Sequence, residues 1–483
     1  MSLDTQAPAR TAERPDNLPD SLPDNAGRAA AGIAIVLGAQ LMLVLDMTVV
    51  NVALPHIDAD LGFGPASLSW VLNGYTLAFG GLLLLGGRLG DVFGRLRVFE
   101  LGLALFTVAS LVGGLAQDPG MLVASRAFQG VGAALAAPGV LALLTTSAPD
   151  EAARNRALAL FAAVSSGGGT LGLLLGGVVT DLGSWRWTLI INVPIGIAVL
   201  LSARRFVDET PRRPGRFDFV GAASATGAAV AIVWSLIGAP DHGWTSARTL
   251  GGLAIGAALL ALLAATEQRV EHPMLRPALL RNRQRIGSLL VMAFIFGAQL
   301  SMFFLAVQYV QRVLGFGPLA SGLAFLPLTV GIFAMSRFTP RLVERFGAAP
   351  LQAIGALALA VSFAWISTAG ATDSYAGAVF GPMLLNGLAA GLIFMPTTSL
   401  VLRGVEPEHA GAASGLLQTM QQLGGAVGLA VIVSVYAAGA VPGEFLPGAQ
   451  AGFLTSSVLA LLAMTASLTL SRARREPAYA EAV

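Results

Sequence analysis

Cysteine and lysine are absent from this chain of 483 residues, and all 29 basic residues are arginine. Without cysteine there are no disulfides, thiol nucleophiles or cysteine metal ligands. The histidines, His56, His242, His272 and His409, each lack a second histidine three to five residues away, so we expect no metal site. The phosphate-binding pattern G-x-x-x-x-G-K-[ST] is also missing, so we expect no nucleotide cofactor.

Charge is scarce as well. Only 12% of the residues are charged and 55% are hydrophobic, whereas a soluble domain carries about 25% charged residues. A hydrocarbon core of about 30 Å needs roughly 20 apolar residues per helical crossing, and such runs follow one another from residue 30 to residue 471. The composition therefore predicts an all-α integral membrane protein. We expect no enzyme activity and no nucleic acid as a partner.

Clusters of proline, glycine and charge separate the apolar runs and set the boundaries of the predicted helices. About fourteen transmembrane helices are expected, at residues 31–54, 67–87, 98–116, 120–146, 156–180, 187–203, 218–238, 248–266, 285–309, 318–336, 349–369, 375–396, 410–438 and 451–471. Residues 1–29 lack the charged-then-apolar layout of a signal peptide and predict a disordered cytoplasmic tail, and residues 473–483 predict a second tail.

Arginine is distributed unevenly between the loops. If the N-terminus is cytoplasmic, the inner segments hold 25 of the 29 arginines. The outer segments hold Arg186, Arg248 and Arg312, and Arg126 falls inside a span. Because positive charge marks cytoplasmic loops, we expect a multi-pass protein of the plasma (inner) membrane with both termini in the cytoplasm.

A short motif occurs twice, at a constant offset of 253 residues. Arg88, Leu89, Asp91, Phe93 and Gly94 recur as Arg341, Leu342, Glu344, Phe346 and Gly347. Both copies follow the second helix of a half if the chain has six-helix pseudo-repeat halves at 30–205 and 271–472 and two inserted helices at 206–270. The alternative is that a short inner loop merely reuses the same residue types.

Asp46 lies in the first span, within the segment Leu45–Pro55 (LDMTVVNVALP), roughly 12 Å below the outer end of its helix. A carboxylate at that depth costs about 2.5 to 3.5 kcal/mol, so it is usually functional. Burial favours the neutral form of a carboxyl and a nearby cation favours the charged form, so such a residue can take up and release a proton. The alternative is an aspartate that only hydrogen-bonds a neighbouring helix.

Arg126 lies in the fourth span, within the pattern L-x-x-x-R-x-x-Q-G-x-G that begins at Leu122. Its depth is about 9 Å below the outer surface, close to that of Asp46. A guanidinium beside that carboxylate would adjust its proton affinity, so we interpret Asp46 and Arg126 as a proton-coupling pair. The alternative is that Arg126 snorkels to the outer headgroups.

The loop after the second span reads Gly87-Arg-Leu-Gly-Asp91-Val-Phe-Gly94-Arg95-Leu-Arg. Asp91 can pair with Arg95, or with an arginine on another helix, and so hold the inner side closed. We interpret Gly87, Asp91, Gly94 and Arg95 as a conformational latch. The alternative is a solvated tight turn.

These three motifs resemble those of the major facilitator superfamily, and within it those of the fourteen-helix drug:proton antiporters. The resemblance runs through nearly the whole chain. It implies a secondary transporter that uses a proton gradient and no other cofactor to export small lipophilic compounds such as drugs. Trp185-Arg186-Trp187 and the segment Asn192–Gly196 are further similarities, which we interpret as mainly structural.

Gly168, Gly172, Gly176 and Gly177 in the fifth span resemble the antiporter motif of this family. Glycines at such spacing allow close helix packing. The family pattern has proline after the second of these glycines, whereas this chain has Leu173, which removes an expected kink. Strict antiport is therefore less firmly implied than helix packing.

Polar side chains on otherwise apolar spans are candidates for a central cavity: Gln40, Asn51, Asn73, Tyr75, Gln129, Gln299, Gln308, Asn386 and Gln418. No acidic residue falls inside a predicted span between residues 285 and 471. A dication needs two buried negative charges, so we expect a small lipophilic substrate that is neutral or monocationic, with protons and the lipid bilayer as the other partners.

Two other functions stay open. A transporter of the same fold can import a nutrient or export a metabolite of the producing cell, which the replacement at Leu173 leaves possible. A membrane-embedded transferase would need clustered acidic metal ligands or a sizeable loop domain, and no loop between the spans offers either.

Overall fold

The computed structural model describes residues 22–64, 67–148, 150–210, 212, 219–267, 282–405, 410–441 and 444–470. The predicted tail at 473–483 and the first 21 residues of the other tail lie outside these ranges. Within them the chain is helical apart from turns and one isolated β-bridge between Val441 and Glu444.

The first half of the chain and the pair that follows it are built from the helices α1 (Leu22–Leu61), η1 (Ser67–Ser69), α2 (Trp70–Phe93), α3 (Arg95–Gly114), α4 (Pro119–Thr146), α5 (Glu151–Leu182), α6 (Trp187–Ile190), α7 (Asn192–Phe206), α8 (Phe219–His242) and α9 (Ala247–Glu267). The second half has α10 (Arg283–Ser301), η3 (Met302–Ala306), α11 (Val307–Arg312), α12 (Pro318–Leu323), α13 (Leu326–Phe346), α14 (Ala348–Ile366), η4 (Ala376–Phe380), α15 (Gly381–Leu402), α16 (Ala410–Ala438) and α17 (Leu446–Leu470).

The described residues form 13 helical stretches that are long and apolar enough to cross a membrane. Helix α5 is a fourteenth when its parts 151–165 and 167–182, which meet at 41°, are counted as one bent span. The predicted all-α membrane fold of about fourteen spans is therefore confirmed. The sixth span is broken between α6 and α7, and a π-helical segment, η3, interrupts the ninth.

Helix α1 is longer than the sequence predicts. Residues 22–29 were expected in a disordered tail, but they form the first turns of a 40-residue helix that ends at Leu61 instead of residue 54. Three consecutive alanines, Ala29 to Ala31, have the highest helix propensity and favour extension of the helix toward the N-terminus.

The two halves repeat the same set of helix contacts. In the first half α1 packs on α5, α2 and α3 pack on α4, and α3 packs on α7. In the second half α10 packs on α16, α13 and α14 pack on α15, and α14 packs on α17. Helices α2 and α16, and helices α5 and α12, join the halves. These matching contacts confirm the predicted pseudo-repeat.

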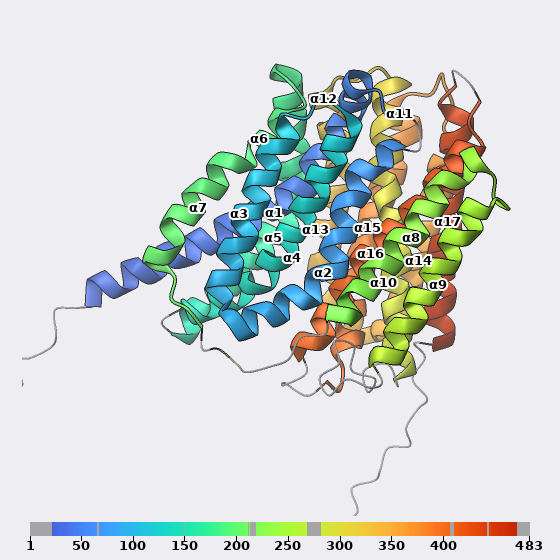
Figure 1. Ribbon diagram of the computed structural model, residues 1–483. Coiled ribbons are helices and arrows are strands. Elements are labelled where there is room, and N and C mark those ends of the chain that lie inside the picture. Colours follow the sequence, from blue (N-terminus) through green and yellow to red (C-terminus); the bar gives the residue numbers. More distant parts are fainter. Residues whose placement is uncertain are drawn as a thin grey trace, which may run out of the picture.

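Helices α8 and α9 pack on each other at one side of the bundle, where α8 also contacts α2 and α16 (Figure 1). Gly81 of α2 lies against Thr226 of α8, and the Ser434 hydroxyl of α16 donates to the Leu236 carbonyl. The inserted pair therefore covers the line along which the halves meet.

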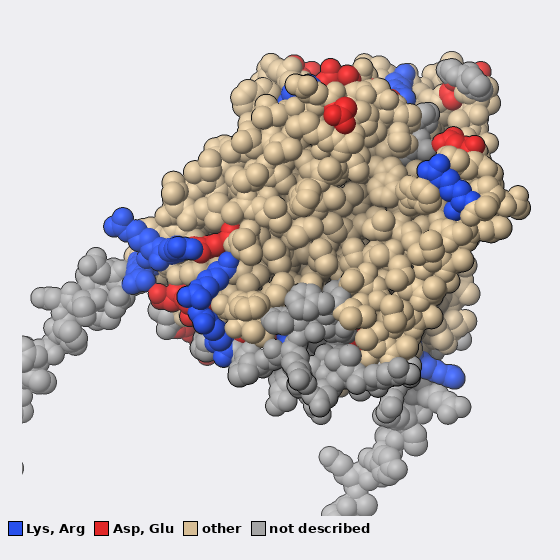
Figure 2. Space-filling model, viewed as in Figure 1, with Lys and Arg blue, Asp and Glu red and all other residues tan. Residues whose placement is uncertain are grey.

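A broad uncharged band crosses the face of the molecule seen in Figure 2, and the charged side chains on this face gather toward its two ends. Large apolar side chains such as Leu101, Leu201 and Ile255 are more than half exposed. An exposed band of this kind matches a lipid bilayer, whose hydrocarbon core cannot solvate charge.

Candidate functional site

Asp46 and Arg126 form an ion pair inside the first half. Arg126 Nη1 lies 2.6 Å from Asp46 Oδ2, and the two side chains are only 1% and 0% exposed. The two residues, which the sequence places at similar depths on α1 and α4, are thus in direct contact. Because Arg126 is buried, snorkelling to the outer surface is excluded for this structure.

Two uncharged amides complete the surroundings of the carboxylate. Gln129 Nε2, one helical turn after Arg126, donates to Asp46 Oδ1 at 3.0 Å. Asn192 Nδ2 donates to the same oxygen at 2.8 Å. Gln129 also donates to Ser110 Oγ of α3 at 2.7 Å. The carboxylate therefore accepts hydrogen bonds from α4 and α7, which spreads its charge over groups held by separate helices.

The guanidinium is held as firmly as the carboxylate. Arg126 Nε donates to the Val71 carbonyl of α2 at 3.0 Å, and Nη1 donates to Gln129 Oε1 at 2.8 Å. The Tyr75 ring lies 4.7 Å from the guanidinium carbon, within cation–π distance. Removing one partner of such a buried pair costs about 3 to 5 kcal/mol, because the other charge stays behind.

The turn between α2 and α3 contains the predicted latch. Arg95 Nη2 lies 2.7 Å from Asp91 Oδ1, and both side chains are partly exposed. Gly94 separates the two helices with φ of +106°, a backbone conformation that only glycine adopts readily. The second copy of the motif has the same break, because Gly347 has φ of +83° between α13 and α14.

Glu209 caps the start of α3. Its carboxylate accepts hydrogen bonds from the backbone N–H groups of Leu96 at 2.9 Å and Arg97 at 3.2 Å. A Cβ on Gly94 would lie 2.5 Å from Glu209 Oε2. An anion at a helix N-terminus is favourable, so Glu209 fixes the segment after α7 against the turn that contains Asp91 and Arg95.

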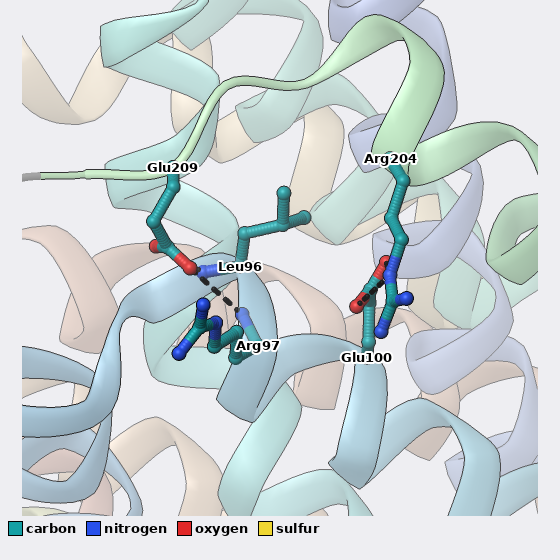
Figure 3. Close-up of a pocket in the computed structure, with 5 residues that line it drawn as sticks. All are labelled: Leu96, Arg97, Glu100, Arg204 and Glu209. Atoms are coloured by element: carbon teal, nitrogen blue, oxygen red, sulfur yellow. Dashed lines mark hydrogen bonds and ion pairs between the residues drawn. The ribbon is translucent and has the colours of Figure 1, made fainter.

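A cavity of about 510 Å³ opens beside this cap (Figure 3). On its other side Arg204 Nε of α7 lies 2.9 Å from Glu100 Oε2 of α3. Helices α3 and α7 are therefore joined twice at this end, once by an ion pair and once by the cap.

The glycines of the fifth span lie at helix contacts. A Cβ on Gly168 would meet Val44 at 2.9 Å, and Gly172 and Gly176 press against Thr48 and the backbone of α1. Gly177 lies against Leu319 of α12, in the other half. Larger side chains would force α1 and α5 apart. Helix α5 has no proline inside it, and its bend lies near residue 166, before Leu173.

The remaining cavity candidates are scattered. Gln299 Nε2 donates to Asn386 Oδ1 at 2.9 Å. Asn73 is fully buried, and neither of its amide atoms has a hydrogen-bond partner within the described chain. Gln40 of α1 donates a hydrogen bond to Ser165 of α5. Asn51 donates to the Met47 and Thr48 carbonyls and Gln308 to the Phe304 carbonyl, each within its own span, and Gln418 is exposed.

Contacts between the halves gather where α1 and α11 end. Arg312 Nη2 lies 2.6 Å from Asp58 Oδ2, and Gln311 Nε2 donates to the Val52 carbonyl at 2.9 Å. Nearby, Asp60 accepts a hydrogen bond from Trp185 Nε1 at 2.9 Å and forms an ion pair with Arg186. Trp185 is therefore a buried residue that links α1 to the segment before α6. Within the described ranges, no three His, Cys, Asp or Glu side chains are placed to hold a metal ion.

Sequence reasoning missed several of these residues. Asn192, interpreted as structural, contacts Asp46 directly, and Ser110 and Glu209 were not considered. The helix break at Ile191 directs Asn192 inward, and a break inside one apolar run leaves little trace in hydropathy. Glu209 lies three residues after the end of α7, whose last turn is basic, and this was the available signal for it.

Known proteins share much of this chain. The Major Facilitator Superfamily profile matches residues 36–429. The cephamycin export protein CmcT of Amycolatopsis lactamdurans is 42% identical over 422 residues, which cover 85% of this chain and 86% of that protein. The puromycin resistance protein pur8 of Streptomyces alboniger is 40% identical over 409 residues, covering 84% and 81%.

Solved structures agree at the level of the fold. The inward-open xylose transporter XylE from E. coli aligns with 93% of this chain and 98% of its own chain, with a TM-score of 0.60 and 15% identity.

Proposed function

Since this chain belongs to the major facilitator superfamily, we propose that it is a secondary transporter that exports small lipophilic compounds across the plasma membrane in exchange for protons. The buried Asp46–Arg126 pair is the observation that carries the proton part of this proposal. Similarity to proteins named for cephamycin export and puromycin resistance supports export of antibiotics or related compounds.

The pair works by competition. In the charged state Arg126 and two amides satisfy the Asp46 carboxylate. A proton on Asp46 removes the negative charge that attracts the guanidinium. The hydrogen bonds of Arg126 to α2 and α4 then contribute more to its position than its contact with α1. Proton binding at one carboxylate can thereby bias how α1 packs on its neighbours, which is the coupling that exchange requires.

Contacts between the halves indicate which side this conformation closes. The Asp58–Arg312 ion pair and the hydrogen bond from Gln311 to the Val52 carbonyl join α1 to α11 at the end expected on the outer side of the membrane. Midway, Thr170 Oγ1 donates to Thr329 Oγ1 at 2.9 Å. From these contacts we infer a form closed to the outside.

Orientation follows from the arginines. Both termini and the loops that carry Arg95, Arg213, Arg283 and Arg341 are expected in the cytoplasm, because 25 of 29 arginines lie on that side. Reporter fusions at residue 213 and at the C-terminus test this. An external reporter at either position would refute the orientation.

Substrate charge follows from the acids. Among the described residues, Asp46 is the only acidic side chain with 0% exposure. Glu100 pairs with Arg204, Glu267 is 6% exposed at the last residue of α9, and Glu344 is exposed. A lipophilic dication would lack the second buried negative charge that its desolvation requires. We therefore propose neutral or monocationic substrates.

Two experiments test the function. Growth-inhibition assays in an efflux-deficient host, with and without this protein, identify exported compounds. Vesicles with an imposed pH gradient then measure the direction of transport relative to the proton flow. Proton-driven export requires the compound and the protons to move in opposite directions, whereas movement of the compound in the same direction as the protons would favour an importer. Equal protein-dependent efflux of a rigid dication and its monocationic analogue would contradict the charge argument.

A further inference from the structure

Asp46 needs a hydrogen-bond acceptor once it carries a proton, because a protonated carboxyl is a donor. All three groups that touch the carboxylate in this structure present N–H donors: Arg126, Gln129 and Asn192. One of them must change, or a buried O–H group is left unsatisfied at a cost of about 1 to 3 kcal/mol.

Arg126 cannot be that group. A guanidinium has no acceptor atom, so a proton on Asp46 Oδ2, which faces Arg126, would have no partner there. The proton is therefore better placed on Oδ1, which faces Gln129 and Asn192.

Gln129 is committed in its present orientation. Its Oε1 accepts from Arg126 at 2.8 Å, and its Nε2 donates to both Asp46 and Ser110. Reversing this amide would place an NH₂ group against the guanidinium and lose that bond. The reversal is unfavourable while Arg126 keeps its position.

Asn192 has no such commitment. Its side chain is fully buried, its Nδ2 donates to Asp46, and its Oδ1 has no hydrogen-bond partner among the described residues. A half-turn of the amide brings Oδ1 to the carboxyl and breaks no bond other than the one it replaces. Asn192 is also the first residue of α7, directly after the helix break at Ile191. A small backbone adjustment that accompanies the amide rotation would therefore not disturb the interior of a helix.

We propose that Asn192 is the positioning residue whose side-chain amide reverses when Asp46 takes up a proton, so that Oδ1 accepts the hydrogen bond of the protonated carboxyl. The inference rests on the proposed role of Asp46 in proton exchange. Arg126 is the charged group that faces Asp46, and Tyr75 of α2 lies behind it. Within the described ranges, the other helices packed on α1 bring no charged or titratable side chain into contact with this carboxyl.

The test follows the carboxyl directly by pH-difference infrared spectroscopy of the full-length protein in lipid. The carboxyl band that disappears in Asp46→Asn identifies Asp46. Asn192→Leu is similar in size and removes both a donor to the charged form and the acceptor of the protonated form. The charged form keeps two donors, Arg126 and Gln129, whereas the protonated form keeps no acceptor, so we expect the band of the protonated carboxyl to move to higher frequency.

Asn192→Thr and Asn192→Val form a matched pair that differs in one rotatable hydroxyl. The threonine band should stay near that of the wild type, and the valine band should follow that of leucine. A band frequency that is unchanged in Asn192→Leu, or equal in the matched pair, overturns the proposal, as does the absence of a titrating Asp46 band. If the leucine variant does not fold, the matched pair decides. Because transport is not measured, failure of proton-driven export in vesicles is a separate result.

Discussion

In the first half Asp46 of α1 faces Gln129 of α4, and in the second half Gln299 of α10 faces Asn386 of α15. The repeat offset of 253 residues takes position 46 to 299, and an offset of 257 takes position 129 to 386. The matched helix contacts of the two halves support the correspondence. The same place in each half therefore holds a polar pair, but only one pair includes a charge.

The packing around the two pairs is the same. Gly130 of α4 lies against the Tyr75 carbonyl, and Gly387 of α15 lies against the Leu328 carbonyl, again at offsets of 257 and 253. Arg126, however, corresponds to the buried Met383. The comparison teaches that the shared backbone keeps its close contacts while the second half has no ionisable group at the positions that correspond to Asp46 and Arg126, so we expect proton exchange at the first-half pair.

The largest expected effect is that of Asp46→Asn, which should abolish proton-driven transport while the protein still reaches the membrane, because an amide cannot carry the proton. Gln299→Leu, at the corresponding position, should keep its response to a pH gradient. Transport in vesicles with and without the gradient measures both. Gradient-driven transport by Asp46→Asn at wild-type rates would show that Asp46 is structural and would erase the difference between the halves.

Next is Arg126→Ala, compared with Met383→Ala. Loss of the guanidinium leaves a buried carboxylate unpaired, which favours its protonated form, so transport should fall by about tenfold or more and its optimum should move to higher pH. Met383→Ala opens a cavity and should lower stability without moving the pH profile. Profiles of the same shape for wild type and Arg126→Ala would count against the pairing mechanism.

A smaller effect is expected at the two glycine breaks. Alanine at a positive φ costs about 1 to 3 kcal/mol, so Gly94→Ala and Gly347→Ala should both lower the thermal unfolding temperature in detergent. Gly94→Ala should lower it more, because its Cβ meets Glu209 whereas that of Gly347 meets only Pro350 at 3.8 Å. Adding Glu209→Ala should reduce that excess. Equal losses at both glycines would remove Glu209 from the explanation.

The smallest effect concerns the latch. Asp91→Asn should lower turnover by up to about fivefold, since a partly exposed pair contributes about 0 to 1 kcal/mol, and substrate affinity should survive. Glu344→Gln, the exposed counterpart in the second half, should change neither. Binding and turnover measured on one preparation separate the two effects, and lost binding with normal turnover would contradict a latch.

The sequence was sufficient for the spans, the pseudo-repeat and the meeting of Asp46 with Arg126, because hydropathy and residue depth determine them. It could not place Asn192, since its contact depends on where the sixth span breaks. Nor could it place Glu209, whose role depends on how the chain after α7 returns to α3. Both contacts join positions more than 110 residues apart, 146 for Asn192 with Asp46 and 113 for Glu209 with Leu96.

The fully buried carboxylate of Asp46 also determines how this protein would respond to the membrane potential. If one proton enters at Asp46 for each compound that leaves, export of a neutral compound moves one net charge inward, and a potential of 100 mV adds about 2.3 kcal/mol to the driving force. Export of a monocation moves no net charge. Collapsing the potential while keeping the pH gradient should therefore slow efflux of neutral compounds and leave that of monocations unchanged.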